Sequence, residues 1–334
     1  MHLHDCFIPD RAINSLVFIL ITYFFIAQAS AQSTRDVSLK TEEPQNDYSA
    51  KLEDPAYFGR SGTDSSNSVA LLEGYRPKWY SMVTNLPGDL TRFATTSFQI
   101  DKLPLSAGIA GLTVGLMTVD NRLWRNERSL YIRSSAFRSF TDDLVWAGDG
   151  RVEFGVAGVF AAYGLALDDS RAIRTGSEVA EAILASGIVD QLLKHISGRQ
   201  RPQAATEPGG DWTFVPGQLS YLRHEPQYDA FPSGHITSAT ALLVVIGENY
   251  PELTWFKPAS YVMMGAIAMS LDAYGYHWWS DIPLGIFLGY SFGEIASHPF
   301  SLNLGHGTSG ESPRLLFQPV MIPEGLGMGL SLSL

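Results

Sequence analysis

Six apolar segments separated by polar stretches constrain the fold of this chain more than any other feature. They lie near residues 103–119, 154–167, 176–194, 236–248, 258–271 and 282–297. Glycines recur within them, and small residues allow helices to approach one another closely, in lipid or in water. We therefore predict an all-α fold, a six-helix bundle with short connecting helices.

The lengths of these segments leave open whether they cross a membrane. A transmembrane helix needs about 20 apolar residues, but the longest segment without a charged residue, Leu103 to Val119, has 17. Glu178, Glu181 and Asp190 interrupt the third segment. By length alone these are core helices of a compact bundle. Charged residues inside a bundle can also face a cavity, so short spanning helices stay open, and we expect association with a membrane surface.

The first 31 residues have the pattern of a signal peptide. An apolar run from Leu16 to Ala27 is followed by Ala29-Ser30-Ala31, a small-x-small cleavage pattern. We predict cleavage before Gln32 and export to the periplasm or cell envelope; an uncleaved anchor helix is the alternative. The single cysteine, Cys6, precedes the apolar run, so a chain that starts at Gln32 has no thiol for a disulfide, a nucleophile or a zinc–thiolate site.

The rest of the chain divides into three predicted regions. Residues 32–77 are polar without a sustained period and indicate a flexible linker or arm. Residues 78–300 form the helical domain, and residues 301–334 a tail with short β-strands. In this tail leucine and methionine alternate with glycine and serine from Leu326 to Leu334, a period of two. We predict a small C-terminal β-hairpin, with Leu316 to Ile322 as the partner strand.

Three cations follow one another closely at the end of the third apolar segment. The formal net charge of the chain is −11, which argues against a nucleic-acid partner, so a phosphate site must concentrate its cations locally. Lys194, Arg199 and Arg201 do this within eight residues. Lysine offers a point charge and arginine a planar fork that matches phosphate oxygens. The alternative is a basic helix end that balances the helix dipole.

Two histidine-containing clusters follow. Phe231-Pro232-Ser233-Gly234-His235 precedes an apolar helical segment, so its turn aims main-chain N–H groups at an anion, with His235 beside it as a proton donor. His277-Trp278-Trp279-Ser280-Asp281 precedes the last segment, and a spacing of four places His277 and Asp281 on one helical face. The carboxylate can then hold one ring nitrogen and leave the other as a nucleophile. A serine helix cap and a surface His–Asp pair are the respective alternatives.

The three clusters, in this order, resemble the type 2 phosphatidic acid phosphatase and vanadium haloperoxidase superfamily. The matching pattern is Lys194-x6-Arg201-Pro202, then Pro232-Ser233-Gly234-His235, then His277-x3-Asp281. The resemblance covers about residues 100–297 and includes the six-helix layout. It implies that Lys194, Arg201 and the main chain at Ser233 and Gly234 hold the phosphate. It further implies that His277 attacks phosphorus, that Asp281 orients His277, and that His235 protonates the leaving group, with no metal and no cofactor.

The chain departs from the family pattern at one position. The third motif of the family usually has an arginine six residues before the histidine, where this chain has Leu271. Loss of one such donor can cost about 3 kcal/mol of transition-state stabilisation. We expect Arg199, close to Arg201, to bind phosphate in place of the missing cation.

We expect a metal-independent phosphatase that acts on a phosphate monoester or diphosphate. A lipid phosphate such as phosphatidate or a polyprenyl diphosphate suits an exported, helix-rich protein, although a small soluble phosphoester fits the same residues. Two alternatives stay open. One is a vanadium-dependent haloperoxidase with vanadate as cofactor. The other is a weakly active or inactive phospholipid-binding protein, because Leu271 removes a cation.

Overall fold

The computed structural model describes residues 75–97, 99–298, 314–322 and 325–333. The predicted signal peptide (1–31) and all but the last residues of the predicted arm (32–77) lie outside the described residues. The chain divides into two compact units, Met1–Pro299 and Phe300–Leu334, which are described separately.

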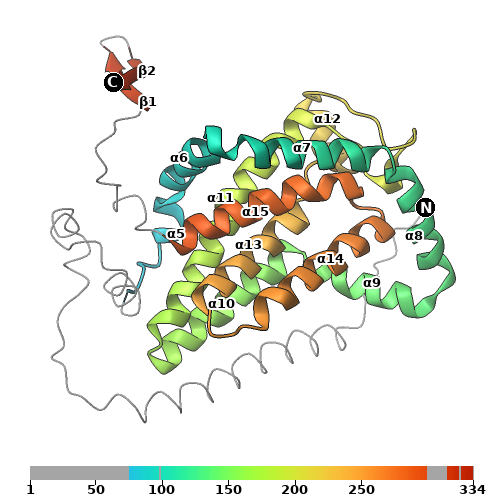
Figure 1. The fold of residues 1–334 in the computed structure, drawn as a ribbon, viewed down its shortest axis with the longest axis horizontal. Helices are drawn as coiled ribbons and strands as arrows, with labels where there is room; N and C mark the ends of the chain where they lie inside the picture. The colour runs from blue at the N-terminus through green and yellow to red at the C-terminus, as the bar shows by residue number, and fades with distance from the viewer. Residues whose placement is uncertain (1–74, 98, 299–313, 323–324, 334) are drawn as a thin grey trace. The chain divides into compact units, whose positions relative to one another are not determined.

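The first unit is mostly helical, as predicted (Figure 1). Its α-helices are α5 (Ser81–Thr84), α6 (Leu86–Ser97), α7 (Leu103–Met117), α8 (Asp120–Arg133), α9 (Ser135–Ala147), α10 (Gly150–Leu167), α11 (Ser170–Ser197), α12 (Gln218–Arg223), α13 (Gly234–Asn249), α14 (Phe256–Tyr274) and α15 (Ile282–Ser297). Short 3-10 turns, η1 (Ile100–Lys102), η2 (Pro202–Ala204), η3 (Glu225–Gln227) and η4 (Trp279–Asp281), connect some of them.

Five of the six predicted segments lie within helices α10, α11, α13, α14 and α15, and the first, 103–119, begins with α7 and extends two residues beyond its end at Met117. Two more helices, α8 and α9, occupy residues 120–147, where no element was predicted. The sequence of α8, DNRLWRNERSLYIR, is dominated by charged and polar residues, so no apolar segment marks it. It nevertheless packs against α14 and supplies a buried residue to the site described below.

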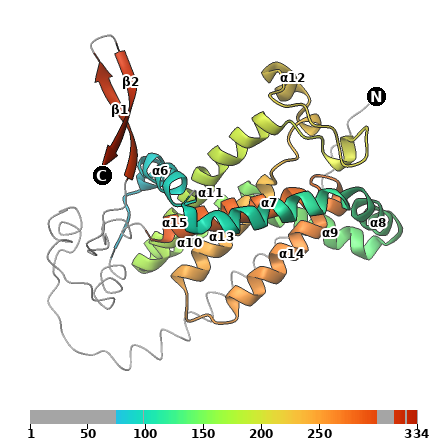
Figure 2. The same ribbon diagram turned by 45° about the horizontal axis from the view of Figure 1, so that its top comes forward.

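The helices α11, α13 and α15 pack against one another in the middle of the unit (Figures 1 and 2). Glycines on α15 permit its close approach to α13. A Cβ atom at Gly289 would lie only 2.2 Å from the carbonyl oxygen of Thr237, and one at Gly285 would lie 2.8 Å from that of Ser233. The beginnings of α13 and α15 therefore meet, which brings the second and third sequence clusters together.

A wide apolar surface is exposed on the first unit. On α7, Leu105, Leu112 and Val114 are each more than half exposed, at 53%, 54% and 62%. Within the described residues, α10 is long and apolar enough to cross a membrane, with 22% of it buried, and α7 with α8 passes the same test as a pair bent by 62°. Apolar patches of this kind on a protein surface indicate contact with lipid or with another protein.

The second unit contains two strands in the region where the sequence predicts a small hairpin. Strand β1 (Arg314–Ile322) pairs antiparallel with β2 (Gly325–Ser333), with Phe317 opposite Leu330.

Candidate active site

The end of α11 and the turn after it place the first cluster. The helix ends at Ser197, and Gly198 follows with a φ of +55°, a left-handed conformation that favours glycine. A Cβ atom at Gly198 would lie 2.0 Å from the carbonyl oxygen of Thr213. The chain therefore leaves the helix in a sharp turn, with Lys194 on the last helical turn and Arg201 beyond it.

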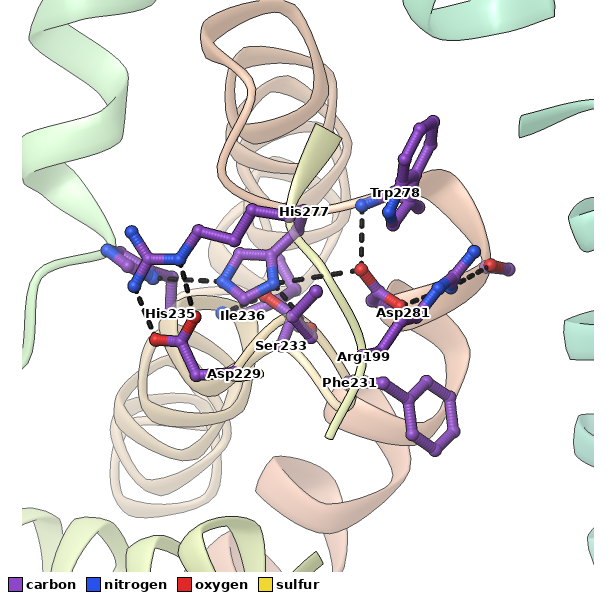
Figure 3. A network of polar contacts seen from close by, with 12 residues as sticks. Arg199, Asp229, Phe231, Ser233, His235, Ile236, His277, Trp278 and Asp281 are labelled. Atoms are coloured by element: carbon purple, nitrogen blue, oxygen red, sulfur yellow. Dashed lines mark hydrogen bonds and ion pairs between the residues drawn. The ribbon is translucent and has the colours of Figure 1, made fainter. Parts of the chain in front are cut away.

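The second and third clusters bring two imidazole rings into contact (Figure 3). Nδ1 of His235 lies 3.2 Å from Nε2 of His277. Nδ1 of His277 lies 2.7 Å from the carbonyl oxygen of Ala230, which can only accept, so Nδ1 carries the proton. Nε2 of His277 is then unprotonated, and its lone pair faces Nδ1 of His235, which donates to it. This is the form of imidazole that a nucleophile requires.

Asp281 holds the turn that carries His277. The predicted shared helical face is absent, because residues 275–281 lie between α14 and α15 and outside any α-helix. Oδ2 of Asp281 accepts the amide of Trp278 at 2.7 Å and lies 3.8 Å from Nδ1 of His277. The hydrogen-bond acceptor for the ring is Ala230 instead. Asp281 therefore acts on His277 through its charge and through the shape of the turn.

Lys194 and Arg201 each lie beside a carboxylate. Nζ of Lys194 is 3.3 Å from Oδ2 of Asp190, and a Cβ atom at Gly234 would lie 3.0 Å from the same Nζ. Arg201 donates through Nε and Nη2 to the two oxygens of Asp229. Because a guanidinium has five N–H groups, these contacts of the described structure leave Arg201 further donors for an anion.

The beginning of α13 adds main-chain donors. Ser233 is the N-cap, and its Oγ accepts the amide of Ile236 at 3.4 Å. Its own amide donates to the carbonyl oxygen of Asp281 at 3.1 Å, so the predicted use of this amide for phosphate is not favoured by the contacts. The amides of Gly234 and His235 open the helix, where N–H groups have no partner within the helix and attract anions.

Burial and nearby cations keep both imidazoles neutral. Burial, together with the charges of Lys194 and Arg201, lowers the pKa of His277 to about 3. Burial, His277 and the same two cations lower the pKa of His235 to about 3. Both cations are therefore close enough to act on both rings. A bound anion would offset their charge and raise the pKa of His235.

Arg199 lies beyond Asp281 as seen from His277 (Figure 3). Its Nη1 donates to Asp281 at 2.5 Å and to Ser280 at 2.6 Å, and its Nη2 donates to Asp120 at 2.7 Å. Nε and Nη2 also donate to the carbonyl oxygen of Gly209, at 3.2 and 2.8 Å. These five bonds occupy all five N–H groups. Arg199 was expected to bind phosphate, but this arrangement leaves it no N–H group for that role.

Asp120 belongs to the hydrogen-bond network around Arg199, and no pattern in the sequence predicted its role there. It begins α8, is fully buried, and accepts from Arg199 and from both the amide and the hydroxyl of Ser280. The contact with Arg199 spans 79 residues of chain, so no local pattern reveals it. Asp190, by contrast, precedes Lys194 by four residues on α11, a spacing that identifies helical ion pairs.

Leu271 is part of the apolar core. It is fully buried in a cluster with Val145, Ile236 and Ile267. Its carbonyl oxygen accepts the amide of His277 at 3.3 Å and so helps to hold the turn after α14. The position that usually carries a cation in the family thus contributes packing and backbone geometry.

A cavity of about 310 Å³ opens beside His235. We call it the catalytic cavity. Its lining includes Gly148 and Asp149 before α10, Lys194 on α11, and Gly234 and Ser238 on α13.

Comparisons with known proteins find a family model that matches part of the chain. Residues 176–302 match the model of the PAP2 superfamily, and this segment contains all three clusters. No curated protein sequence matches the chain. One solved structure that resembles it is described as the first transmembrane PAP2 type phosphatidylglycerolphosphate phosphatase from Bacillus subtilis. That match has a TM-score of 0.41 and 14% identity over 69% of this chain and 100% of the other. Over residues 176–302, which hold all three clusters, the chain is thus similar to the PAP2 superfamily.

Proposed function

We propose that this protein is a phosphatase that hydrolyses a lipid phosphate through a phosphohistidine on His277. The observation that carries the proposal is the unprotonated Nε2 of His277, which lies 3.2 Å from His235. The ring is held in that form by the carbonyl oxygen of Ala230. Two cations, Lys194 and Arg201, act on the same two rings.

In the first step a phosphate group enters between the two rings, which must move apart to admit it. Lys194, Arg201 and the amides of Gly234 and His235 bind its oxygens. Nε2 of His277 then attacks phosphorus, and the bond between phosphorus and the leaving oxygen breaks. His235, protonated beside the bound anion, gives its proton to that oxygen.

In the second step water attacks the phosphohistidine, and His235 accepts the proton of that water. The bond between phosphorus and nitrogen breaks, inorganic phosphate leaves, and His277 returns to its neutral form. Cations and main-chain N–H groups stabilise the charge on the phosphoryl oxygens in both steps. The proposed reaction therefore uses no metal and no cofactor.

Membrane association and a lipid substrate are supported by the surface of the first unit. The exposed leucines and valine of α7 and the largely exposed helix α10 offer a broad apolar area. An exported protein with such a surface would meet phospholipids or prenyl phosphates at the cell envelope. We therefore propose that it acts at a membrane surface, in the periplasm or cell envelope.

The proposal is tested by phosphate release from phosphatidate, a polyprenyl diphosphate and a chromogenic phosphoester, with and without EDTA. We expect release that persists in EDTA, is inhibited by vanadate and is lost in His277→Ala. No release from any of the three would refute the proposal. Halide oxidation by peroxide after addition of vanadate would instead identify a haloperoxidase.

A further inference from the structure

Glu153 is a buried carboxyl group that forms no hydrogen bond with the residues that the structure describes. It lies on α10, one helical turn after Asp149, and its exposed fraction is 0%. Neither of its carboxyl oxygens has a hydrogen-bond partner in the described part of the chain. The hydroxyl of Ser238 faces it from α13, but that hydroxyl donates to the carbonyl oxygen of Gly234 at 3.0 Å. Buried polar groups are normally paired, so an unpaired one needs an explanation.

Glu153 lines a second, apolar cavity of about 190 Å³ between α10, α13 and α14. Phe160, Leu242 and Met263 contribute to its walls, and among its lining residues Glu153 is the one that titrates. An apolar cavity of about 150 Å³ can hold benzene, so this one has room for part of a hydrocarbon chain. It reaches the surface at Trp255, which is 47% exposed.

The two cavities are lined by residues that neighbour one another in the chain, near Glu153. Ala147 lines the apolar cavity and the next residue, Gly148, lines the catalytic one. On α13 the same division falls between Ala239 and Ser238. Glu153 lines the apolar cavity and lies close to Ser238 and Asp149, which line the catalytic cavity.

We propose that Glu153 recognises the oxygen-containing linker between the phosphate and the apolar chain of a glycerolipid substrate. The proposal rests on the proposed phosphatase function and narrows its substrate. Burial raises the pKa of Glu153 to about 8, so at neutral pH the carboxyl is mostly protonated and can donate a hydrogen bond. The ester carbonyl of an acylglycerol phosphate would accept that bond. An alkyl or prenyl phosphate has no oxygen there and would leave the buried carboxyl unpaired.

The test compares two substrates of equal chain length, an acylglycerol phosphate and an alkyl phosphate without linker oxygens. In the wild type we expect the acylglycerol phosphate to have the higher kcat/KM. Glu153→Leu should lower kcat/KM for the acylglycerol phosphate by about 10- to 100-fold, mainly through KM, because one hydrogen bond to it is lost. The alkyl phosphate should be unaffected or improved. Glu153→Gln, which keeps a donor, should stay close to the wild type.

A matched variant distinguishes recognition of the linker oxygens from binding of the apolar chain. Ala259→Phe, in the wall of the apolar cavity, should raise KM for both substrates alike. The proposal would be overturned if Glu153→Leu lowered kcat/KM equally for the acylglycerol phosphate and for the alkyl phosphate.

Binding measurements keep this test independent of turnover. In the His277→Ala background, Glu153→Leu should weaken binding of the acylglycerol phosphate and not of the alkyl phosphate. If the wild type hydrolyses neither substrate, the proposed phosphatase function fails, and these affinities still decide the role of Glu153. The proposed role of Glu153 would be refuted if the two ligands bound with equal affinity to His277→Ala and again with equal affinity to the double variant with Glu153→Leu.

Discussion

Replacing Arg199 by lysine distinguishes a residue that positions Asp281 from one that binds phosphate. The lysine keeps a positive charge but has no fork that reaches Asp281, Asp120 and Ser280 together. In the structure those three partners lie 2.5, 2.7 and 2.6 Å from the guanidinium. We expect the substitution to loosen Asp281 and to leave the phosphate-binding groups in place.

The size of the effect follows from the distance between Asp281 and His277. With an effective dielectric constant of about 20, a unit charge on Asp281 stabilises positive charge on the His277 ring 3.8 Å away by about 4 kcal/mol. Loss of half of that stabilisation, about 2 kcal/mol, corresponds to a roughly 30-fold lower kcat. Because Ala230 still holds the ring tautomer, we do not expect the larger losses that follow when the tautomer is wrong.

The pH dependence gives a second readout. Burial raises the pKa of Asp281 to about 6, and Arg199 is the largest influence that lowers it. Weakening the contact with Arg199 should raise this pKa further. Asp281 acts as an anion, so the variant should lose activity at a higher pH than the wild type as the pH falls. The pH profile of kcat measures this shift directly.

Inhibition by vanadate distinguishes positioning of Asp281 from phosphate binding, and Arg201→Lys is the matched variant. Arg199→Lys should lower kcat and change the inhibition constant for vanadate by less than about threefold. Arg201→Lys should raise that constant by about 10- to 100-fold, because hydrogen bonds to a charged ligand are lost. The reasoning would be refuted if Arg199→Lys weakened vanadate binding as strongly as Arg201→Lys and left the acid limb of the pH profile unmoved.

Two further predictions concern the intermediate and the packing of the core. Rapid quenching with labelled substrate should trap an acid-labile, base-stable phosphoryl group that is absent in His277→Ala; absence of label in the wild type would contradict a covalent route. Gly289→Ala should lower Tm, because its Cβ would lie 2.2 Å from the carbonyl oxygen of Thr237 and overpacking costs about 1–3 kcal/mol. Gly265→Ala, with nothing within 4 Å, should leave Tm unchanged or slightly higher. Equal Tm values for the two variants would show that α13 and α15 can separate without cost.

The sequence determined the helical class, the positions of six helices and the order of the three clusters. These are local properties: apolar segments mark α7, α10, α11, α13, α14 and α15, and the clusters stand where those helices begin or end. The polar helix α8 escaped prediction because its sequence lacks such a segment. Residues that act within one helix, such as Asp190 and Lys194, are accessible to the same reasoning.

Only the tertiary structure decided which groups of the site position other side chains and which remain available to bind a substrate. The carbonyl oxygen of Ala230 fixes the ring of His277, and Asp120 holds Arg199 at the back of Asp281. Each of these contacts joins residues more than 40 positions apart in the chain. The spacing of residues along the sequence predicts which side chains are neighbours on one helix. Which N–H groups of a cation remain available to a substrate depends on the hydrogen bonds that the cation already makes with residues distant in the chain.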